Sequence, residues 1–138
     1  MAKTRLGSRG SFSGNVVEQI TTATTLTPSD SGKVFAVTAA SLYTITLPAV
    51  APGINYKFFI QEDGLTGDVT ITAASTLIYG NLDIQADTNE DNRVACVGGT
   101  SIVFEAAGKR GDSLSLVSDG TYWYATGFSQ AQGGFTVS

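Results

Sequence analysis

Residues Ser113–Thr126 read SLSLVSDGTYWYAT, and this stretch decides the fold. Apolar side chains alternate with small or polar ones around Asp119-Gly120, a period of two that is typical of half-buried β-strands. An Asp-Gly pair between two such runs predicts a hairpin with a two-residue loop, because that loop needs positive φ angles. The predicted register places three pairs opposite one another: Ser118 with Thr121, Leu116 with Trp123, and Leu114 with Ala125.

The two faces of this predicted hairpin differ in chemistry. One face collects the side chains that we expect in the core, namely Leu114, Leu116, Trp123 and Ala125. On the other face Val117 meets Tyr122. Tyr122 and Tyr124 are therefore candidates for an oligomer interface, because aromatic residues are enriched at protein interfaces.

The period of two continues along the rest of the chain. Pro52-Gly53 suits the two central positions of a type II turn. No segment sustains a helical period over three turns, and only Asp83–Glu90 has room for a single helical turn. Short strands about 8–12 residues apart predict an all-β fold, a single antiparallel β-sandwich or barrel formed by residues 15–138. Besides the hairpin, Ser113–Ser118 with Thr121–Thr126, we expect strands near Val16–Ile20, Lys33–Thr38, Leu42–Leu47, Tyr56–Gln61, Val69–Ala73, Leu77–Ile84, Arg93–Val97, Thr100–Ala106 and Gly134–Val137.

A second two-residue loop is predicted at Gly98-Gly99. Its register would put Val94 opposite Val103 on one face, and Ala95 and Val97 opposite Ile102 and Thr100 on the other. Both faces of this hairpin would be apolar. We therefore expect it to be buried on both sides or to meet another subunit, which makes Val94 and Val103 oligomer interface candidates.

Composition excludes several kinds of chemistry. The chain has 138 residues with 18 Thr, 13 Ser and 16 Gly, no histidine and one cysteine. Without histidine there is no Ser-His-Asp or Cys-His catalysis, and one cysteine allows no intramolecular disulfide. No apolar run approaches the roughly 20 residues that span a bilayer, and Met1–Gly14 lacks a signal-peptide core. We expect a soluble protein made in a cytoplasm, not an enzyme, with neither cofactor nor metal.

Two acidic clusters and one Arg-Gly-Asp tripeptide are better interpreted as loops or turns than as sites. Glu62-Asp63 with Asp68 resembles a glycosidase carboxylate pair only in composition, because adjacent side chains on an extended segment point to opposite faces. Arg110–Ser113 contains the Arg-Gly-Asp tripeptide, which we interpret as a turn entering the next strand. The second acidic cluster could hold a hard cation, but its spacing matches no EF-hand loop: Asp83, Asp87, Glu90 and Asp91.

Cys96 lies within an apolar run, Val94–Val97, and no base accompanies it in the sequence. A buried, inert thiol is the expected state.

The N-terminal segment differs from the rest of the chain. Residues 1–14 carry three basic residues and no acid, whereas the remainder has five basic and 12 acidic residues. Such a basic segment can bind nucleic acid, a membrane surface or an acidic protein, or remain a solvated terminus. With so few charges we favour a flexible arm that orders on a protein partner, through Lys3, Arg5, Leu6, Arg9 and Phe12.

Several segments resemble small all-β virion proteins of tailed bacteriophages. These are Asp30–Phe35, Thr44–Pro48, Gly53–Phe58, Val69–Thr72 and Gly111–Tyr124, which together span about residues 24–128. Among these proteins the chain is most similar to a capsid decoration (cement) protein, because of its length and because it has no coiled-coil or collagen-like shaft. That resemblance implies homotrimers on the outer surface of the phage head, with arms that clamp neighbouring subunits of the major capsid protein.

The resemblance carries no site residues, because it rests on residues that shape the fold. We expect a virion structural protein that stabilises coat-subunit junctions and binds neither nucleic acid nor membrane. The alternative is a tail-fibre or receptor-binding module in which exposed tyrosines contact host glycans.

Overall fold

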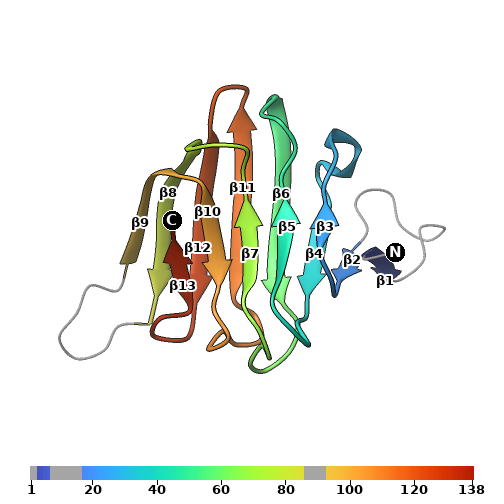
Figure 1. The fold of residues 1–138 in the computed structure, drawn as a ribbon, viewed down its shortest axis with the longest axis vertical. Coiled ribbons are helices and arrows are strands. Elements are labelled where there is room, and N and C mark those ends of the chain that lie inside the picture. Colours follow the sequence, from blue (N-terminus) through green and yellow to red (C-terminus); the bar gives the residue numbers. More distant parts are fainter. Residues whose placement is uncertain (1–2, 7–16, 86–92) are drawn as a thin grey trace.

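The computed structural model describes residues 3–6, 17–85 and 93–138, drawn in colour in Figure 1. Within these ranges a single helical turn is present, the 3₁₀ turn Pro28–Asp30. The strands are β1 (Lys3–Leu6), β2 (Val17–Ile20), β3 (Thr24–Thr25), β4 (Val34–Val37), β5 (Tyr43–Thr46), β6 (Pro52–Ile60), β7 (Val69–Thr72), β8 (Ile78–Ile84), β9 (Arg93–Gly99), β10 (Ser101–Phe104), β11 (Ser113–Asp119), β12 (Trp123–Ser129) and β13 (Phe135–Val137).

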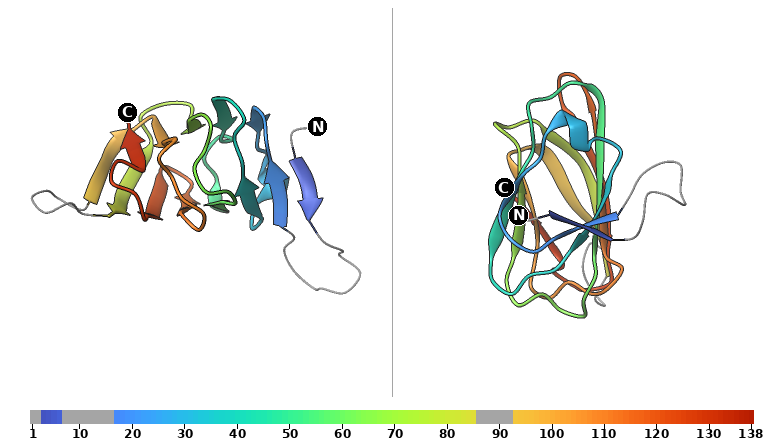
Figure 2. Two further views of the ribbon diagram at one scale, coloured as in Figure 1. Left: turned by 90° about the horizontal axis from the view of Figure 1, so that it is seen from below. Right: turned by 90° about the vertical axis from the view of Figure 1, so that its right-hand side faces the viewer.

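The strands form two sheets that pack face to face. The larger sheet has the order β1-β2-β4-β6-β11-β12-β8-β9, and the smaller one β13-β10-β7-β5-β3. Figure 2 shows the two layers edge-on, with the smaller sheet lying over the larger. The predicted all-β sandwich and the near-absence of helix are confirmed.

The core lies between the layers and is aromatic at its centre. Phe35 stacks on Phe58 with ring centroids 5.5 Å apart, and Tyr56 lies 5.8 Å from Trp123. All four rings are essentially inaccessible to solvent. The predicted core position of Trp123 is therefore confirmed.

Both sheets are mixed, which corrects the purely antiparallel arrangement expected from the sequence. From β2 to β7 the chain alternates between the sheets at each strand, so that β2, β4 and β6 run parallel, as do β3, β5 and β7. Strand β12 is also parallel to β8. A parallel pair needs a crossover connection, and here a strand of the opposite sheet supplies it.

The hairpin of β11 and β12 is confirmed, but its register is shifted. Ser118 pairs with Trp123 and Leu116 with Ala125, because the loop is centred one residue later, on Gly120-Thr121. Gly120 has a φ of 98° at the first central position, as a type II′ turn requires. When the centre of the loop moves by one residue, each residue of β11 pairs with a residue two positions further along β12 than predicted. A shift of two residues preserves the face, so each side chain keeps its predicted face.

The Gly98-Gly99 hairpin prediction is wrong. Strand β9 pairs with β8 in the larger sheet, whereas β10 pairs with β7 and β13 in the smaller one. At this point the chain crosses between the sheets, and the N–H groups of Thr100 and Ser101 donate to the carbonyl oxygen of Ser138 at 2.6 and 3.0 Å. A Cβ on Gly99 would lie 2.4 Å from the Cys96 sulfur, so a side chain at this position would displace that sulfur.

The Pro52-Gly53 turn is confirmed. Gly53 has a φ of 83°, and the N–H of Ile54 donates to the carbonyl oxygen of Ala51 at 3.3 Å. This is the geometry of a type II turn, and β6 begins within it.

Candidate functional site

Of the predicted hard-cation cluster, the structure describes Asp83 alone. Asp83 pairs with Arg93 at 3.2 Å, and Asp87, Glu90 and Asp91 lie outside the described residues. Across residues 3–6, 17–85 and 93–138, no group of three or more acidic or cysteine side chains is placed to hold a metal ion. Of the Asp83–Glu90 segment in which a helical turn was expected, Asp83 and Ile84 belong to β8.

The carboxylates near residue 65 serve the loops. Glu62 accepts a hydrogen bond from the N–H of Ala39 at 2.7 Å, and Asp68 accepts one from the N–H of Ala106 at 2.9 Å. Asp63 lies 3.7 Å from Arg110. Each of the three carboxylates thus has a different partner, and no two of them point at a common site.

Asp112, the acid of the Arg-Gly-Asp tripeptide, is buried, with 1% of its surface exposed. Its carboxylate accepts hydrogen bonds from the Lys109 and Gln130 N–H groups at 2.9 Å and from the Ser129 hydroxyl at 2.6 Å. These bonds join the loop before β11 to the loop after β12. The predicted turn role is confirmed, and the carboxylate is inaccessible to a partner.

Cys96 is also buried, and its thiol donates to the carbonyl oxygen of Ile78 at 3.3 Å. Burial raises the pKa of this thiol, which keeps it protonated and weakly reactive. The predicted burial of this thiol is confirmed.

The exposed apolar surface lies mainly on the outer face of the larger sheet. Directly paired residues on this face form a row that crosses five strands: Asn55, Val117, Tyr124, Tyr79 and Val97. Tyr122 packs edge-on against Tyr79 with centroids 5.0 Å apart. We call Tyr79, Tyr122 and Tyr124 the tyrosine cluster. Its shallow recess measures about 330 Å³.

Asp119 holds one side of the tyrosine cluster in place. Its carboxylate accepts hydrogen bonds from the N–H groups of Thr121 and Tyr122 at 2.8 and 2.9 Å, and from the Tyr124 hydroxyl at 2.9 Å. The N–H groups of Tyr122 and Thr121, followed by the Tyr124 hydroxyl, lower the pKa of Asp119 below its ordinary value. The same contact raises the pKa of Tyr124, because an ionised phenol would lose the bond and face a carboxylate.

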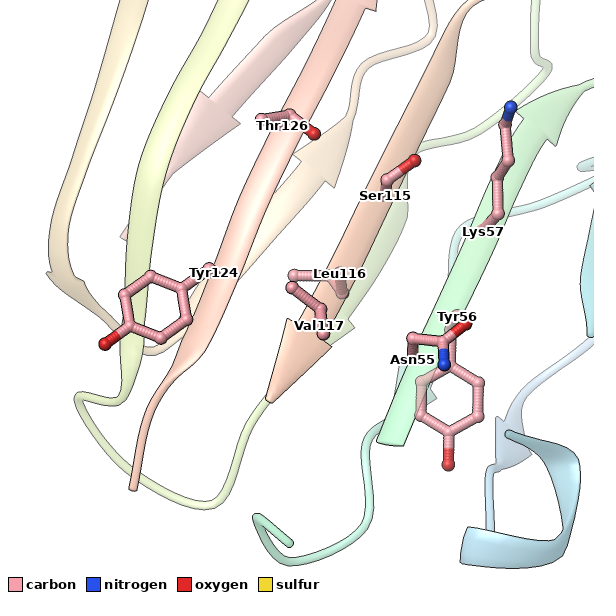
Figure 3. Close-up of a pocket in the computed structure, with 8 residues that line it drawn as sticks. All are labelled: Asn55, Tyr56, Lys57, Ser115, Leu116, Val117, Tyr124 and Thr126. Atoms are coloured by element: carbon pink, nitrogen blue, oxygen red, sulfur yellow. The ribbon is translucent and has the colours of Figure 1, made fainter. Parts of the chain in front are cut away.

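A polar row lies beside the tyrosine cluster. Lys57, Ser115 and Thr126 are directly opposite one another on β6, β11 and β12. They line a groove of about 310 Å³ (Figure 3). The other residues that line it are Asn55, Tyr56, Leu116, Val117 and Tyr124. We call this the β6–β11–β12 groove.

The sequence predicted only part of this surface. Tyr122 and Tyr124 do share an exposed face, as expected for interface candidates. Val94 instead packs against the core from β9, while half-buried Val103 lies on the smaller sheet, so the two do not face each other. The sequence analysis missed Tyr79, Lys57, Ser115 and Thr126. Lys57 could have been found from its position between two core aromatics, Tyr56 and Phe58, which points it outward.

The predicted arm begins with a strand. Lys3, Arg5 and Leu6 lie on β1, which pairs antiparallel with β2 at one edge of the larger sheet. Lys3–Leu6 is therefore part of the sheet, which corrects the prediction of a wholly flexible arm. Arg9 and Phe12 lie outside the described residues.

No described helix is long and apolar enough to cross a membrane. Comparison of the chain with models of protein families, with curated proteins and with solved structures gave no significant match.

Proposed function

We propose that the chain is a non-enzymatic virion structural protein, a capsid decoration protein that binds the outer surface of a phage head and stabilises coat-subunit junctions. The resemblance of about residues 24–128 to phage virion proteins supports this role. So does the absence of histidine from the chain.

The observation that carries the proposal is the position of β1. It is the last strand of the larger sheet, and β2 is its one partner among the described strands. The outer side of an edge strand presents backbone N–H and C=O groups that can pair with a strand of another protein. In this proposal an extended segment of the major capsid protein adds to β1.

The charges of the N-terminal segment suit an acidic coat surface. Lys3 and Arg5 lie on the edge strand, and Arg9 follows it in the sequence. Exposed ion pairs contribute only about 0–1 kcal/mol each, so they tune affinity and add salt sensitivity. A standard interface buries about 1,600 Å², and repetition around the shell multiplies a small gain per copy.

Proline substitutions test strand addition directly. Successive N–H groups of a strand point to opposite sides, so one of Thr4 and Arg5 donates toward β2 and the other points outward. Thr4→Pro and Arg5→Pro should both reduce binding to undecorated heads, and only one of them should also weaken the pairing with β2. Attachment that neither substitution affects would contradict the proposed mode of binding.

The proposal also includes a homotrimer, which the resemblance implies. Sedimentation equilibrium at micromolar concentration should then give three times 14.3 kDa. A monomer at every concentration would contradict the homotrimer, and the coat lattice alone would then determine how the copies are arranged.

A second candidate is a tail-fibre or receptor-binding module. The tyrosine cluster favours it, because exposed aromatic rings that also carry hydroxyl groups are suited to sugars. The position of the protein in the virion, on the head or on the tail, distinguishes the two candidates.

A further inference from the structure

The β6–β11–β12 groove combines two kinds of surface that lie side by side. Lys57, Ser115 and Thr126 form the polar row, and their side chains have no hydrogen-bond or ion-pair partner among the residues that the structure describes. Next to this row lie Val117, 47% exposed, and Tyr124, 43% exposed. Figure 3 shows both rows opening toward the same side of the sheet.

The polar row is rich in donors and carries a positive charge. A lysine ammonium group has three N–H donors and no acceptor, and each hydroxyl group adds a donor. Elsewhere in the chain Lys33 binds Glu18 and Asp30, whereas no carboxylate lines the groove. Asp119, at the end of the neighbouring row, already accepts the three hydrogen bonds described above. The complementary ligand group is an anionic acceptor such as a carboxylate.

The apolar row defines the rest of the ligand. The Tyr124 ring is anchored through its hydroxyl to Asp119 and leaves a face free beside Val117. The electron-rich face of such a ring attracts the weakly positive C–H groups of a sugar ring. A carboxylate attached to a ring with C–H groups on one face matches both rows.

The size of the groove suits a small ligand. It crosses three strands about 4.8 Å apart, so it is about 10 Å wide, the size of one or two sugar rings. Its volume of about 310 Å³ is at the lower end of the usual range for small-molecule sites. A protein interface centred here is less favoured, because lysine is depleted from interface cores.

We infer that the β6–β11–β12 groove binds an acidic sugar, a sialic or uronic acid residue of a surface polysaccharide. Lys57, Ser115 and Thr126 bind its carboxylate, and Tyr124 with Val117 supports its ring. This activity goes beyond attachment to the head through β1, since the groove lies several strands away from that edge. A decoration protein with such a groove would bring the virion to a glycan-coated cell.

The test is calorimetric titration of the full chain with 3′-sialyllactose and a glucuronic acid disaccharide, with lactose as the neutral comparison. We expect binding of at least one acidic sugar and much weaker binding of lactose. Lys57→Gln should weaken acidic-sugar binding by about tenfold, the loss of one charge-assisted contact. Lys109→Gln, which removes an exposed lysine in a loop outside the groove, should have no effect. Tyr124→Ser should abolish binding and leave the β-sheet circular dichroism spectrum intact.

Four results would overturn the inference. They are no binding of either acidic sugar at millimolar concentration, binding that Lys57→Gln leaves unchanged, equal affinity for a hexaglutamate peptide, and self-association of the chain that Tyr124→Ser abolishes. The third would mean that the groove responds to charge alone, and the fourth that a second copy covers it. Failure here leaves attachment through β1 untouched, because the proline variants test that edge separately.

Discussion

The Tyr124 hydroxyl donates a 2.9 Å hydrogen bond to the carboxylate of Asp119, five residues before it in the sequence. The same carboxylate closes the loop between β11 and β12 through two backbone N–H groups. One acidic side chain therefore shapes the hairpin turn and orients the Tyr124 ring of the tyrosine cluster.

This relationship predicts a pH dependence. The hydrogen bonds lower the pKa of Asp119 in the folded state, so their stabilisation is complete above the unfolded value of about 3.9 and is lost as the pH falls through the folded pKa. Asp119→Asn should make the free energy of unfolding depend less on pH below about pH 4, as measured by urea denaturation. Tyr124→Phe removes only the smallest of the contributions that the three hydrogen bonds make to the lowered pKa of Asp119. It should therefore reduce the pH dependence of the unfolding free energy less than Asp119→Asn does. Identical pH profiles for wild type and Asp119→Asn would contradict this assignment.

Substitution of Trp123 should depend on volume and hardly on its N–H group. The indole is fully buried, and its nitrogen has no hydrogen-bond partner in the described parts of the chain. Trp123→Ala should therefore cost about 3–5 kcal/mol, as large cavities do. Trp123→Phe should cost clearly less, because it loses no hydrogen bond and retains most of the packing. Chemical denaturation of both variants compares the two costs, and equal losses would contradict a cost set by the volume of the side chain.

Gly80 should be irreplaceable. A Cβ at this position would lie 1.9 Å from the carbonyl oxygen of Ala125 on the parallel neighbour β12, and the φ of 155° is strained for other residues. Gly80→Ala should therefore separate β8 from β12 and lower the melting temperature sharply. Gly133→Ala is the matched control, since that glycine also has a positive φ but open space around it. A Gly80→Ala protein as stable as the control would show that the strands are not packed this closely.

Asp112 should stabilise the loops rather than bind a receptor. Asp112→Ala leaves the N–H groups of Lys109 and Gln130 and the Ser129 hydroxyl without their acceptor. Of these three bonds only the one from Ser129 is buried, and an unsatisfied buried group costs about 1–3 kcal/mol, so a loss of that order is expected in urea denaturation. Arg110→Ala, which changes an exposed member of the tripeptide, should cost far less. Integrin binding that Asp112→Ala abolishes without loss of stability would contradict this role.

Local alternation predicted the strands well because it depends on neighbouring residues alone. The β11–β12 faces were correct even though the register was shifted, since a change of two residues preserves the face. The Gly98-Gly99 prediction failed because a glycine pair suits a hairpin or a crossover equally. Here the crossover is held by hydrogen bonds from Thr100 and Ser101 to Ser138, which lies far along the chain.

The candidate site was harder to predict for the same reason. Tyr122 and Tyr124 lie in one strand region and could be recognised together, but Tyr79 comes beside them only through the parallel pairing of β8 with β12. Likewise, Lys57 meets Ser115 and Thr126 only after β6, β11 and β12 align. A period of two shows which way each side chain points and leaves open which strands are neighbours.

The proposed place on a phage head is best tested by cryo-electron microscopy of tailed-phage particles incubated with the purified protein. The account predicts β-sandwich density repeated over the outer surface of the head, at junctions between coat subunits, with β1 next to a coat-protein strand. Density confined to the tail, or heads whose surface carries no copy of the protein, would contradict it.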